Sequence, residues 1–254
     1  MISRYSVTLN NVSLASLDPS ILVLDVKYNP RGTQDKTFEV AKRHGARFHD
    51  RKFGTVSVTI PFEIHEYDVA DRQEVCANVV KWAKNGGVLE INDRPGQYLQ
   101  CVCTSFPTVE SARNWTDPLN ITFTAYAIPF WQEETAVTKT LTGTSDSDAL
   151  TVPGNVDDAL VECEITAGAS VSSFSLTVNG RTLTLSGLSL SSGDVVTISY
   201  DTDGIQSIKQ GSTSLLNKRT GVDDLLANCG ESNNLFISSS ASITAVFSVR
   251  GLWL

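Results

Sequence analysis

The chain has 254 residues, which is long enough to bury one large or two medium hydrophobic cores. Its formal net charge of -8 is unevenly distributed: residues 1–132 carry 14 acidic and 14 basic side chains, whereas residues 133–254 carry 14 acidic and 6 basic ones. Such an acidic half is repelled by phosphate backbones, which argues against nucleic acid as a partner. Residues 1–10 lack a signal-peptide pattern, and no apolar run of about 18 residues occurs. We therefore expect a soluble protein, without membrane insertion, that folds in a cytoplasm.

Aromatic residues change in frequency at the same place as the charge. Residues 1–132 hold 15 of the 20 Phe, Trp and Tyr residues. The segment from Thr138 to Asp148 is rich in Thr, Ser, Gly and Asp, as a solvated connection is. The sequence therefore predicts an N-terminal domain over residues 1–132, a linker over 133–148 and a C-terminal domain over 149–254.

The first half predicts a β-rich domain with one helix. Residues Val56 to Ile60 and Leu119 to Tyr126 alternate apolar and polar side chains, which is the period of a strand with one buried face. From Asp68 to Gly86 apolar residues instead recur every three or four positions, so we expect an amphipathic helix over about residues 68–85 that crosses the sheet. Asp68 can cap its first turn and Gly86 can end its last one. The turn signal Asp93-Arg94-Pro95-Gly96 then separates two further predicted strands.

The segment from Arg31 to Lys52 holds seven basic and three acidic residues, and its apolar residues follow no single period. We expect a long exposed loop or ribbon there. Two interpretations stay open, a solvated loop and a contact arm between subunits. For the contact arm, the candidate interface residues are Arg43, Arg47, Arg51, Lys52 and Phe53.

The second half has a clear β signature. Around Asn179-Gly180, a two-residue loop would pair Phe174 with Leu185 and Leu176 with Leu183, and would pair Thr177 with Thr182. A second hairpin is predicted from Val195 to Lys209, and alternating apolar residues from Ile243 to Val249 predict a closing strand. Short strands at this spacing are typical of a β-sandwich.

Motifs that would carry chemistry are sparse. The cysteines are scattered and odd in number, which favours buried free thiols over disulfides or a metal site: Cys76, Cys101, Cys103, Cys163 and Cys229. The histidines His44, His49 and His65 lack a metal-binding helical spacing, and no nucleophile elbow, P-loop or dinucleotide fingerprint occurs. A hydrolase would need carboxylates that face each other across a cleft, whereas the paired acids of this chain are adjacent in sequence. We therefore expect no enzyme activity, no catalytic residues, no cofactor and no metal.

Glycan binding is the main alternative function. Carbohydrate modules stack sugar rings on exposed aromatic side chains. Phe174 is predicted on the apolar face of a hairpin, and Phe236 and Phe247 alternate with polar neighbours as core residues do. Tyr200 and Trp253 are then the aromatic candidates that remain in the second half.

Several short motifs occur in one order along nearly the whole chain. In the first half they are Phe48-His49-Asp50-Arg51-Lys52-Phe53-Gly54, Val80-Lys81-Trp82-Ala83, Asp93-Arg94-Pro95-Gly96-Gln97-Tyr98, Ile121-Thr122-Phe123-Thr124 and Pro129-Phe130-Trp131. In the second half they are Gly154-Asn155, Asp223-Asp224-Leu225-Leu226, Gly230-Glu231-Ser232-Asn233-Asn234 and Arg250-Gly251-Leu252-Trp253-Leu254. In this order and spacing the chain resembles the distal tail (Dit) proteins of long-tailed, non-contractile bacteriophages (siphophages) and related prophages.

The resemblance implies a structural protein of the virion tail tip, made and assembled in the cytoplasm of the bacterial host. It implies a homohexameric ring that joins the tail tube to the baseplate or receptor-binding apparatus, built by the N-terminal domain and followed by a galectin-like C-terminal β-sandwich. The implied partners are the major tail tube protein, the tape measure, and the hub, fibre or receptor-binding proteins. Under this resemblance the Arg31 to Lys52 segment is a subunit-contact element. The alternative remains a glycan-binding, galectin-like module that contributes to adhesion to the host surface.

Overall fold

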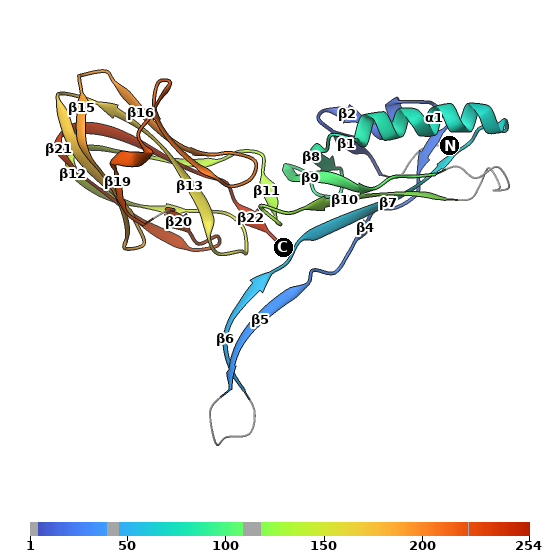
Figure 1. Ribbon diagram of the computed structural model, residues 1–254, viewed down its shortest axis with the longest axis horizontal. Helices are drawn as coiled ribbons and strands as arrows, with labels where there is room; N and C mark the ends of the chain where they lie inside the picture. The colour runs from blue at the N-terminus through green and yellow to red at the C-terminus, as the bar shows by residue number, and fades with distance from the viewer. Residues whose placement is uncertain (1–4, 40–45, 109–117, 223) are drawn as a thin grey trace. The chain divides into compact units, whose positions relative to one another are not determined.

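The structure is a computed structural model that describes residues 5–39, 46–108, 118–222 and 224–254, with the backbone alone for residues 38, 39 and 46–51. The chain divides into two compact units, Met1–Phe130 and Trp131–Leu254 (Figure 1). Strands dominate both units, and the described residues contain one α-helix. None of the described helices is long and apolar enough to cross a membrane.

The first unit is a curled antiparallel sheet with a helix on one face. Its elements are β1 (Val7–Leu9), β2 (Val12–Ser13), the 3-10 helix η1 (Leu14–Ser16), β3 (Ile21–Val23), β4 (Lys27–Tyr28), β5 (Thr33–Glu39), β6 (Ala46–Phe53), β7 (Val56–Ile64), α1 (Val69–Ala83), β8 (Gly87–Ile91), β9 (Gln97–Ser105) and β10 (Leu119–Ala125). The strand order is β2-β1-β8-β9-β10-β7-β3, β4 also pairs with β7, and β5 and β6 form a separate two-stranded sheet.

Strands β7 and β10 confirm the predicted alternation and form the centre of this core. Val58 lies opposite Phe123, and Ile60 lies opposite Ile121. All four side chains are fully buried. On the other face of the same strands the hydroxyls of Thr59 and Thr122 lie 3.0 Å apart. The period-2 pattern therefore separates a core face from a polar face, as expected for a half-buried sheet.

Helix α1 begins and ends where local chemistry predicts. The Asp68 carboxylate accepts a hydrogen bond from the Ala70 amide at 2.7 Å, which caps the first turn. Gly86 follows the last turn with φ 63, a left-handed conformation that suits glycine. The Trp82 ring packs edge-to-face on Phe123 with 5.9 Å between ring centroids. The apolar face of α1 thus covers the core face of β10.

The second unit is built almost entirely from strands. Its elements are β11 (Trp131–Glu133), β12 (Val137–Thr151), β13 (Ala159–Ala167), β14 (Val171–Val178), β15 (Arg181–Leu190), β16 (Val195–Tyr200), β17 (Gln206–Gln210), β18 (Thr213–Ser214), the 3-10 helix η2 (Leu216–Lys218), β19 (Arg219–Gly221), β20 (Leu226–Ala227), β21 (Ser232–Val249) and β22 (Leu252–Trp253). The strand order is β18-β17-β16-β13-β21-β14-β15-β19, and β12 also pairs with β21.

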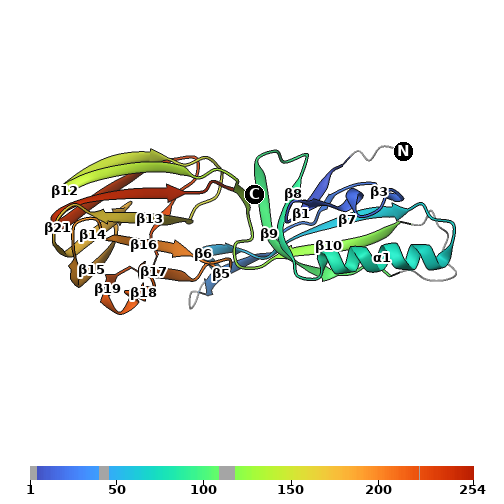
Figure 2. The ribbon, with the colours of Figure 1, turned by 90° about the horizontal axis from the view of Figure 1, so that it is seen from above.

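The long strand β21 changes its pairing partners along its length. Its residues Leu235–Ser239 pair with β14, whereas Ile243–Val249 pair with β13. Strand β12 follows it, first along Ile243–Val249 and then along Ser232–Ser238, with a register shift between Gly143 and Ser145. Figure 2 shows β12 running beside β21 along the second unit. Phe174 of β14 and Phe247 of β21 are both buried in the core of this β-sandwich.

The predicted hairpins are confirmed. Leu176 pairs with Leu183, Phe174 pairs with Leu185, and the hydroxyls of Thr177 and Thr182 lie 2.8 Å apart. Asn179 and Gly180 have φ 50 and φ 80, as a type I′ turn requires. In the second hairpin β16 pairs with β17, from Val196 opposite Gln210 to Tyr200 opposite Gln206.

The predicted linker over residues 133–148 is wrong. Most of this segment forms β12, which pairs with β21 along its whole length. The error has a physical cause, because β12 is an edge strand whose residues are mostly exposed, with Leu141 and Leu150 as its buried anchors. A Thr- and Ser-rich composition is compatible with such a strand as well as with a loop.

The predicted core position of Phe236 is also wrong, because its side chain is 40% exposed. Its neighbours Leu235 and Ile237 are buried instead. Successive side chains of a strand point to opposite faces. Because Leu235 and Ile237 both lie on the core face, Phe236 between them lies on the outer face.

Candidate subunit-contact arm

Strands β5 and β6 form a two-stranded antiparallel ribbon, here called the arm (residues 33–53), which pairs with no other strand of the described chain (Figure 1). The pairing runs from Thr33 opposite Phe53 to Glu39 opposite Ala46. The basic segment is thus a ribbon, one of the two forms that the sequence predicts for it.

The structure describes the five candidate interface residues to different extents. Arg43 lies outside the described residues. Arg47 and Arg51 lie on β6, where the structure describes the backbone alone. Lys52 and Phe53 are exposed at the end of β6, and Phe53 is 41% exposed. Their role as contact residues stays a prediction.

The backbone register places opposite charges across the arm. Arg51 lies opposite Asp35, and Asp50 lies opposite Lys36. The register then shifts, so that Thr37 lies opposite Phe48 and His49 is the extra residue of a bulge. Cross-strand pairs of opposite charge favour this register over alternatives that set like charges opposite each other.

The described side chains on the strands of the arm are exposed to solvent. Residues 33–37 and both Lys52 and Phe53 are exposed. An isolated two-stranded ribbon is marginally stable in water, because it has no hydrophobic face to bury. A partner surface against the arm would supply the missing burial.

Aromatic and backbone contacts fix the base of the arm. The rings of Phe53 and Phe130 pack edge-to-face with 5.9 Å between centroids, and the Arg31 guanidinium lies 4.9 Å from the centroid of Phe130. The Gly54 amide donates a hydrogen bond to the Gly32 carbonyl at 2.7 Å, directly below the last strand pair. Edge-to-face and cation–π contacts are each worth about 0.5–1.5 kcal/mol, so together they can set the direction in which the arm leaves the unit.

A second polar cluster lies in the same unit. The Tyr28 hydroxyl donates to the Asp93 carboxylate at 2.6 Å, and the Arg94 guanidinium lies 5.0 Å from the centroid of the Tyr28 ring. Burial, followed by the hydrogen bond with Asp93, raises the pKa of Tyr28. Burial, followed by the charge of Arg94, lowers the pKa of Arg31. No local sequence pattern predicts these contacts of Tyr28 and Phe130, because they join segments that are distant along the chain.

The five thiols and His65 are the cysteine and histidine side chains that the structure describes. All five cysteines are free, and four are buried, with Cys103 partly exposed. Burial, with a smaller effect from Cys103, raises the pKa of Cys101 to about 12. His65 contacts the Glu63 carboxylate at 2.8 Å, whereas His44 lies outside the described residues. Among the described residues, no group of His, Cys, Asp and Glu is arranged to hold a metal ion.

The two aromatic candidates for sugar stacking are engaged within the second unit. The Tyr200 hydroxyl accepts a hydrogen bond from the Gln206 amide at 3.1 Å, and burial raises the pKa of Tyr200 to about 12. The Trp253 indole donates to the Glu133 carboxylate at 2.6 Å. Phe236, which the sequence placed in the core, is the more accessible aromatic ring.

Comparison with known proteins identifies the fold. No family model matches the sequence, and no curated protein does. The SPP1 Dit (gp 19.1) protein, described as a paradigm of the hub adsorption apparatus in phages that infect Gram-positive bacteria, matches 97% of this chain and 98% of its own, with a TM-score of 0.68 and 10% identity. Two structures of the activated phage P2 baseplate, with Ca and with Sr, match 94% and 98% of this chain and 98% of their own, at 8% identity and TM-scores of 0.45 and 0.49.

The chain thus has the two-unit, mostly β fold of a phage distal tail protein. This confirms, at the level of fold, the resemblance predicted from the order of short motifs. The similarity extends over nearly the full length of both chains, so it covers the arm-bearing unit and the sandwich alike.

Proposed function

We propose that this protein is a structural subunit of a phage or prophage tail tip, a hub that connects the tail tube to the baseplate or receptor-binding apparatus. The observation that carries the proposal is the full-length match to the SPP1 Dit protein, at a TM-score of 0.68. The role requires no catalytic group, cofactor or metal. Its site of action would be the virion tail tip, after assembly in the host cytoplasm.

The arm supplies the contact between neighbouring copies in this proposal. The segment from Arg31 to Lys52 carries a net charge of +4, so the rest of residues 1–132, with 7 basic and 11 acidic side chains, carries a net charge of -4. Opposite charges on two parts of one chain favour contact between copies, and an exposed ribbon gains stability when a neighbour covers it. A closed ring follows if each copy offers its arm to the next, and we expect six copies.

The other proposed partners are classes of tail protein. The ring would contact the major tail tube protein on one side and hub, fibre or receptor-binding proteins on the other. The tape measure protein is a further proposed partner. The second unit would project a galectin-like sandwich that holds receptor-binding components. Its charge of -8 favours exposure to solvent and disfavours nucleic acid.

Excision of the arm tests this proposal directly. Because the Gly54 amide and the Gly32 carbonyl are 2.7 Å apart, a two-residue turn can replace residues 33–53 without stretching the chain. We expect wild-type protein to form a six-fold species at high concentration in light scattering. We expect the excised variant to be monomeric and folded, with a far-UV spectrum that lacks only the contribution of β5 and β6. Wild-type protein that is monomeric at every concentration, or an excised variant that keeps its ring, would contradict assembly through the arm.

A charge variant separates the basic character of the arm from its shape. Lys52→Glu reverses an exposed charge on the arm, and Lys209→Glu makes the same change on the exposed surface of β17. We expect Lys52→Glu to weaken self-association about tenfold and the control to leave it unchanged. Equal effects of the two changes would point to general electrostatics and away from the arm.

A glycan-binding role for the second unit is favoured by one observation, the exposed ring of Phe236. In register with it lie Ser147 on one side and Thr177 on the other, so hydroxyl groups flank an aromatic platform. A glycan array with wild-type protein and Phe236→Ala tests this role, with Tyr67→Ala in the first unit as the control for loss of an exposed ring. A blank array, or equal binding by both variants, would remove this candidate function.

A further inference from the structure

Strand β12 is the longest uncovered edge of the second unit. It has 15 residues, and among the described strands it pairs with β21 alone. One row of its backbone amides and carbonyls therefore points away from its single partner. Such an edge is a template on which the strand of another chain can pair, and natural sheets carry specific devices that prevent it.

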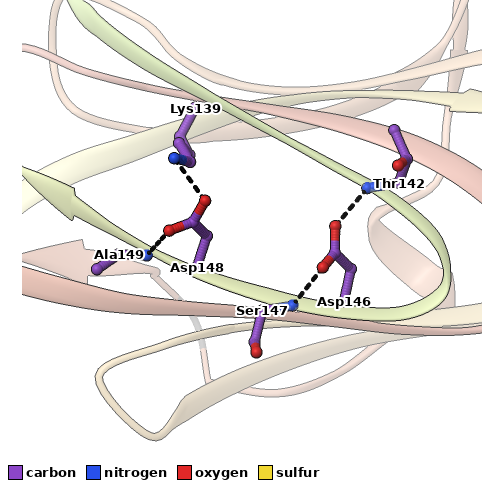
Figure 3. Close-up of polar contacts among 6 residues, drawn as sticks. All are labelled: Lys139, Thr142, Asp146, Ser147, Asp148 and Ala149. Carbon is purple, nitrogen blue, oxygen red and sulfur yellow. Dashed lines mark hydrogen bonds and ion pairs between the residues drawn. The ribbon is translucent and has the colours of Figure 1, made fainter.

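The strand folds back on itself at Gly143, which has φ 112. Before the bend, Val137–Gly143 pair with one half of β21, and after it, Ser145–Thr151 pair with the other half. The two halves of β12 consequently run side by side, joined by a turn (Figure 3).

The Asp146 carboxylate joins the two halves. One oxygen, Oδ2, accepts a hydrogen bond from the Thr142 amide at 2.9 Å, and the other, Oδ1, accepts one from the Ser147 amide at 2.9 Å. Thr142 lies before the bend and Ser147 lies after it, so a single carboxylate occupies an amide on each side (Figure 3).

The Asp148 carboxylate repeats this arrangement two residues further on. Its Oδ1 accepts a hydrogen bond from the Ala149 amide at 2.7 Å, and its Oδ2 lies 2.5 Å from the Lys139 ammonium on the first half (Figure 3). These contacts hold the pKa of Asp148 below its ordinary value, with the hydrogen bond from Lys139 as the largest cause. The two aspartates and Lys139 are called the clasp below.

The clasp occupies the groups that strand addition would need. An amide that donates to a side chain of its own strand cannot donate to the carbonyl of an incoming strand. Three amides of the edge, those of Thr142, Ser147 and Ala149, are occupied in this way. Charged side chains at an edge, lysine above all, are also features with which natural sheets discourage pairing.

We propose that the clasp closes the β12 edge against pairing with the β12 edge of a second copy of this chain. A second β12 is the occupant that fits, because it offers the same uncovered length and the same run of Thr and Ser residues with high strand propensity. With the clasp in place, approach of two such edges brings four carboxylates together and displaces three amide hydrogen bonds on each copy. Without it, both edges present unoccupied donors and acceptors.

The test is the double variant Asp146→Ala with Asp148→Ala in the full chain. The matched control is Asp157→Ala with Asp203→Ala, which removes the same charge from exposed positions of the second unit away from β12. Sedimentation velocity over a range of concentrations reports the mass of each species, and hydrogen exchange reports protection of the β12 amides.

We expect the clasp variant to form a species of twice the wild-type mass, with association at least tenfold tighter than in the control. Amide exchange in β12 should become slower as the concentration rises. Wild-type mass at all concentrations, or association without new protection in β12, would overturn the proposal. If the double variant fails to fold, Asp148→Ala alone leaves the Asp146 bridge in place, and we expect weaker association from it; wild-type mass with this variant would likewise count against the clasp.

Discussion

Asn233 offers the sharpest test of how the second unit is held together. Its side chain is fully buried, and the two N–H groups of its amide nitrogen are shared among the carbonyls of Leu150, Asn228 and Glu231 at 3.2, 3.0 and 3.2 Å. Its carbonyl oxygen accepts from the Asn179 side chain at 2.8 Å and from the Asn228 amide at 2.7 Å. One side chain thus ties the end of β12, the loop before β21 and the Asn179-Gly180 turn together.

Replacement of Asn233 by alanine would leave these groups without their partner. The Leu150 carbonyl is in a buried environment and the Asn228 amide in a partly buried one. Since an unsatisfied buried polar group costs about 1–3 kcal/mol, we expect Asn233→Ala to lower the free energy of unfolding of the second unit by about 2–5 kcal/mol. Asn233→Asp should be worse, because a carboxylate cannot donate to three carbonyls and would be buried as a charge.

Hydrogen exchange with mass spectrometry measures this effect within the second unit, because the peptides of β14 and β21 report its opening separately from the first unit. The matched control is Asn234→Ala, an exposed neighbour whose effect we expect to stay within about 0.5 kcal/mol. An Asn233→Ala protein as stable as the control would refute the view that this network organises the unit.

Three further predictions concern the thiols, a glycine and the clasp. Cys103 should react first with an alkylating reagent at pH 8, because it is partly exposed, whereas burial raises the pKa of the fully buried Cys163; faster reaction at Cys163 in peptide mapping would contradict this order. Gly86→Ala should cost more than about 3 kcal/mol, because its Cβ would lie 2.3 Å from the Cys101 carbonyl, while Gly96→Ala, with φ 75 and no atom within 4 Å, should cost about 1–2 kcal/mol; equal melting temperatures would refute the steric reason. Because the folded pKa of Asp148 is depressed, its contribution to stability is complete above the ordinary aspartate pKa and is lost as the pH falls through the lower folded value; a carboxyl titration by NMR with an unshifted or raised midpoint would show that the clasp is open in solution.

Local patterns predicted the elements whose chemistry lies within a few neighbouring residues. The Asp68 cap and Gly86 define the helix, because a helix terminus needs a side-chain acceptor and a left-handed residue close by. The Asn179-Gly180 turn fixes the register of its hairpin, because both central residues require positive φ. In each case the sequence separation between cause and effect is small.

The segments whose predictions were wrong depend instead on residues that are distant along the chain. The linker prediction for residues 133–148 relied on composition, whereas this segment becomes a strand through pairing with β21, at the other end of the unit. The sequence pattern placed Phe236 on the core face of its strand. In the structure Leu235 and Ile237 lie on the core face instead, and Phe236 lies on the exposed face. Periodicity over a few residues does not predict which face of a strand is buried, because the pairing register with neighbouring strands decides it.

The sequence by itself determined the class of this protein: a mostly β chain of two units with one amphipathic helix, a basic exposed segment in the first unit, and an order of motifs that resembles distal tail proteins. The tertiary structure decided which distant groups meet. It placed Phe130 and Arg31 at the base of the arm, it put Asn233 at the centre of a buried network, and it brought Lys139 opposite Asp148. The contacts of Asn233 and of Lys139 with Asp148 depend on how β12 and β21 bend together, and that bend is a property of the paired strands and not of any short stretch of sequence.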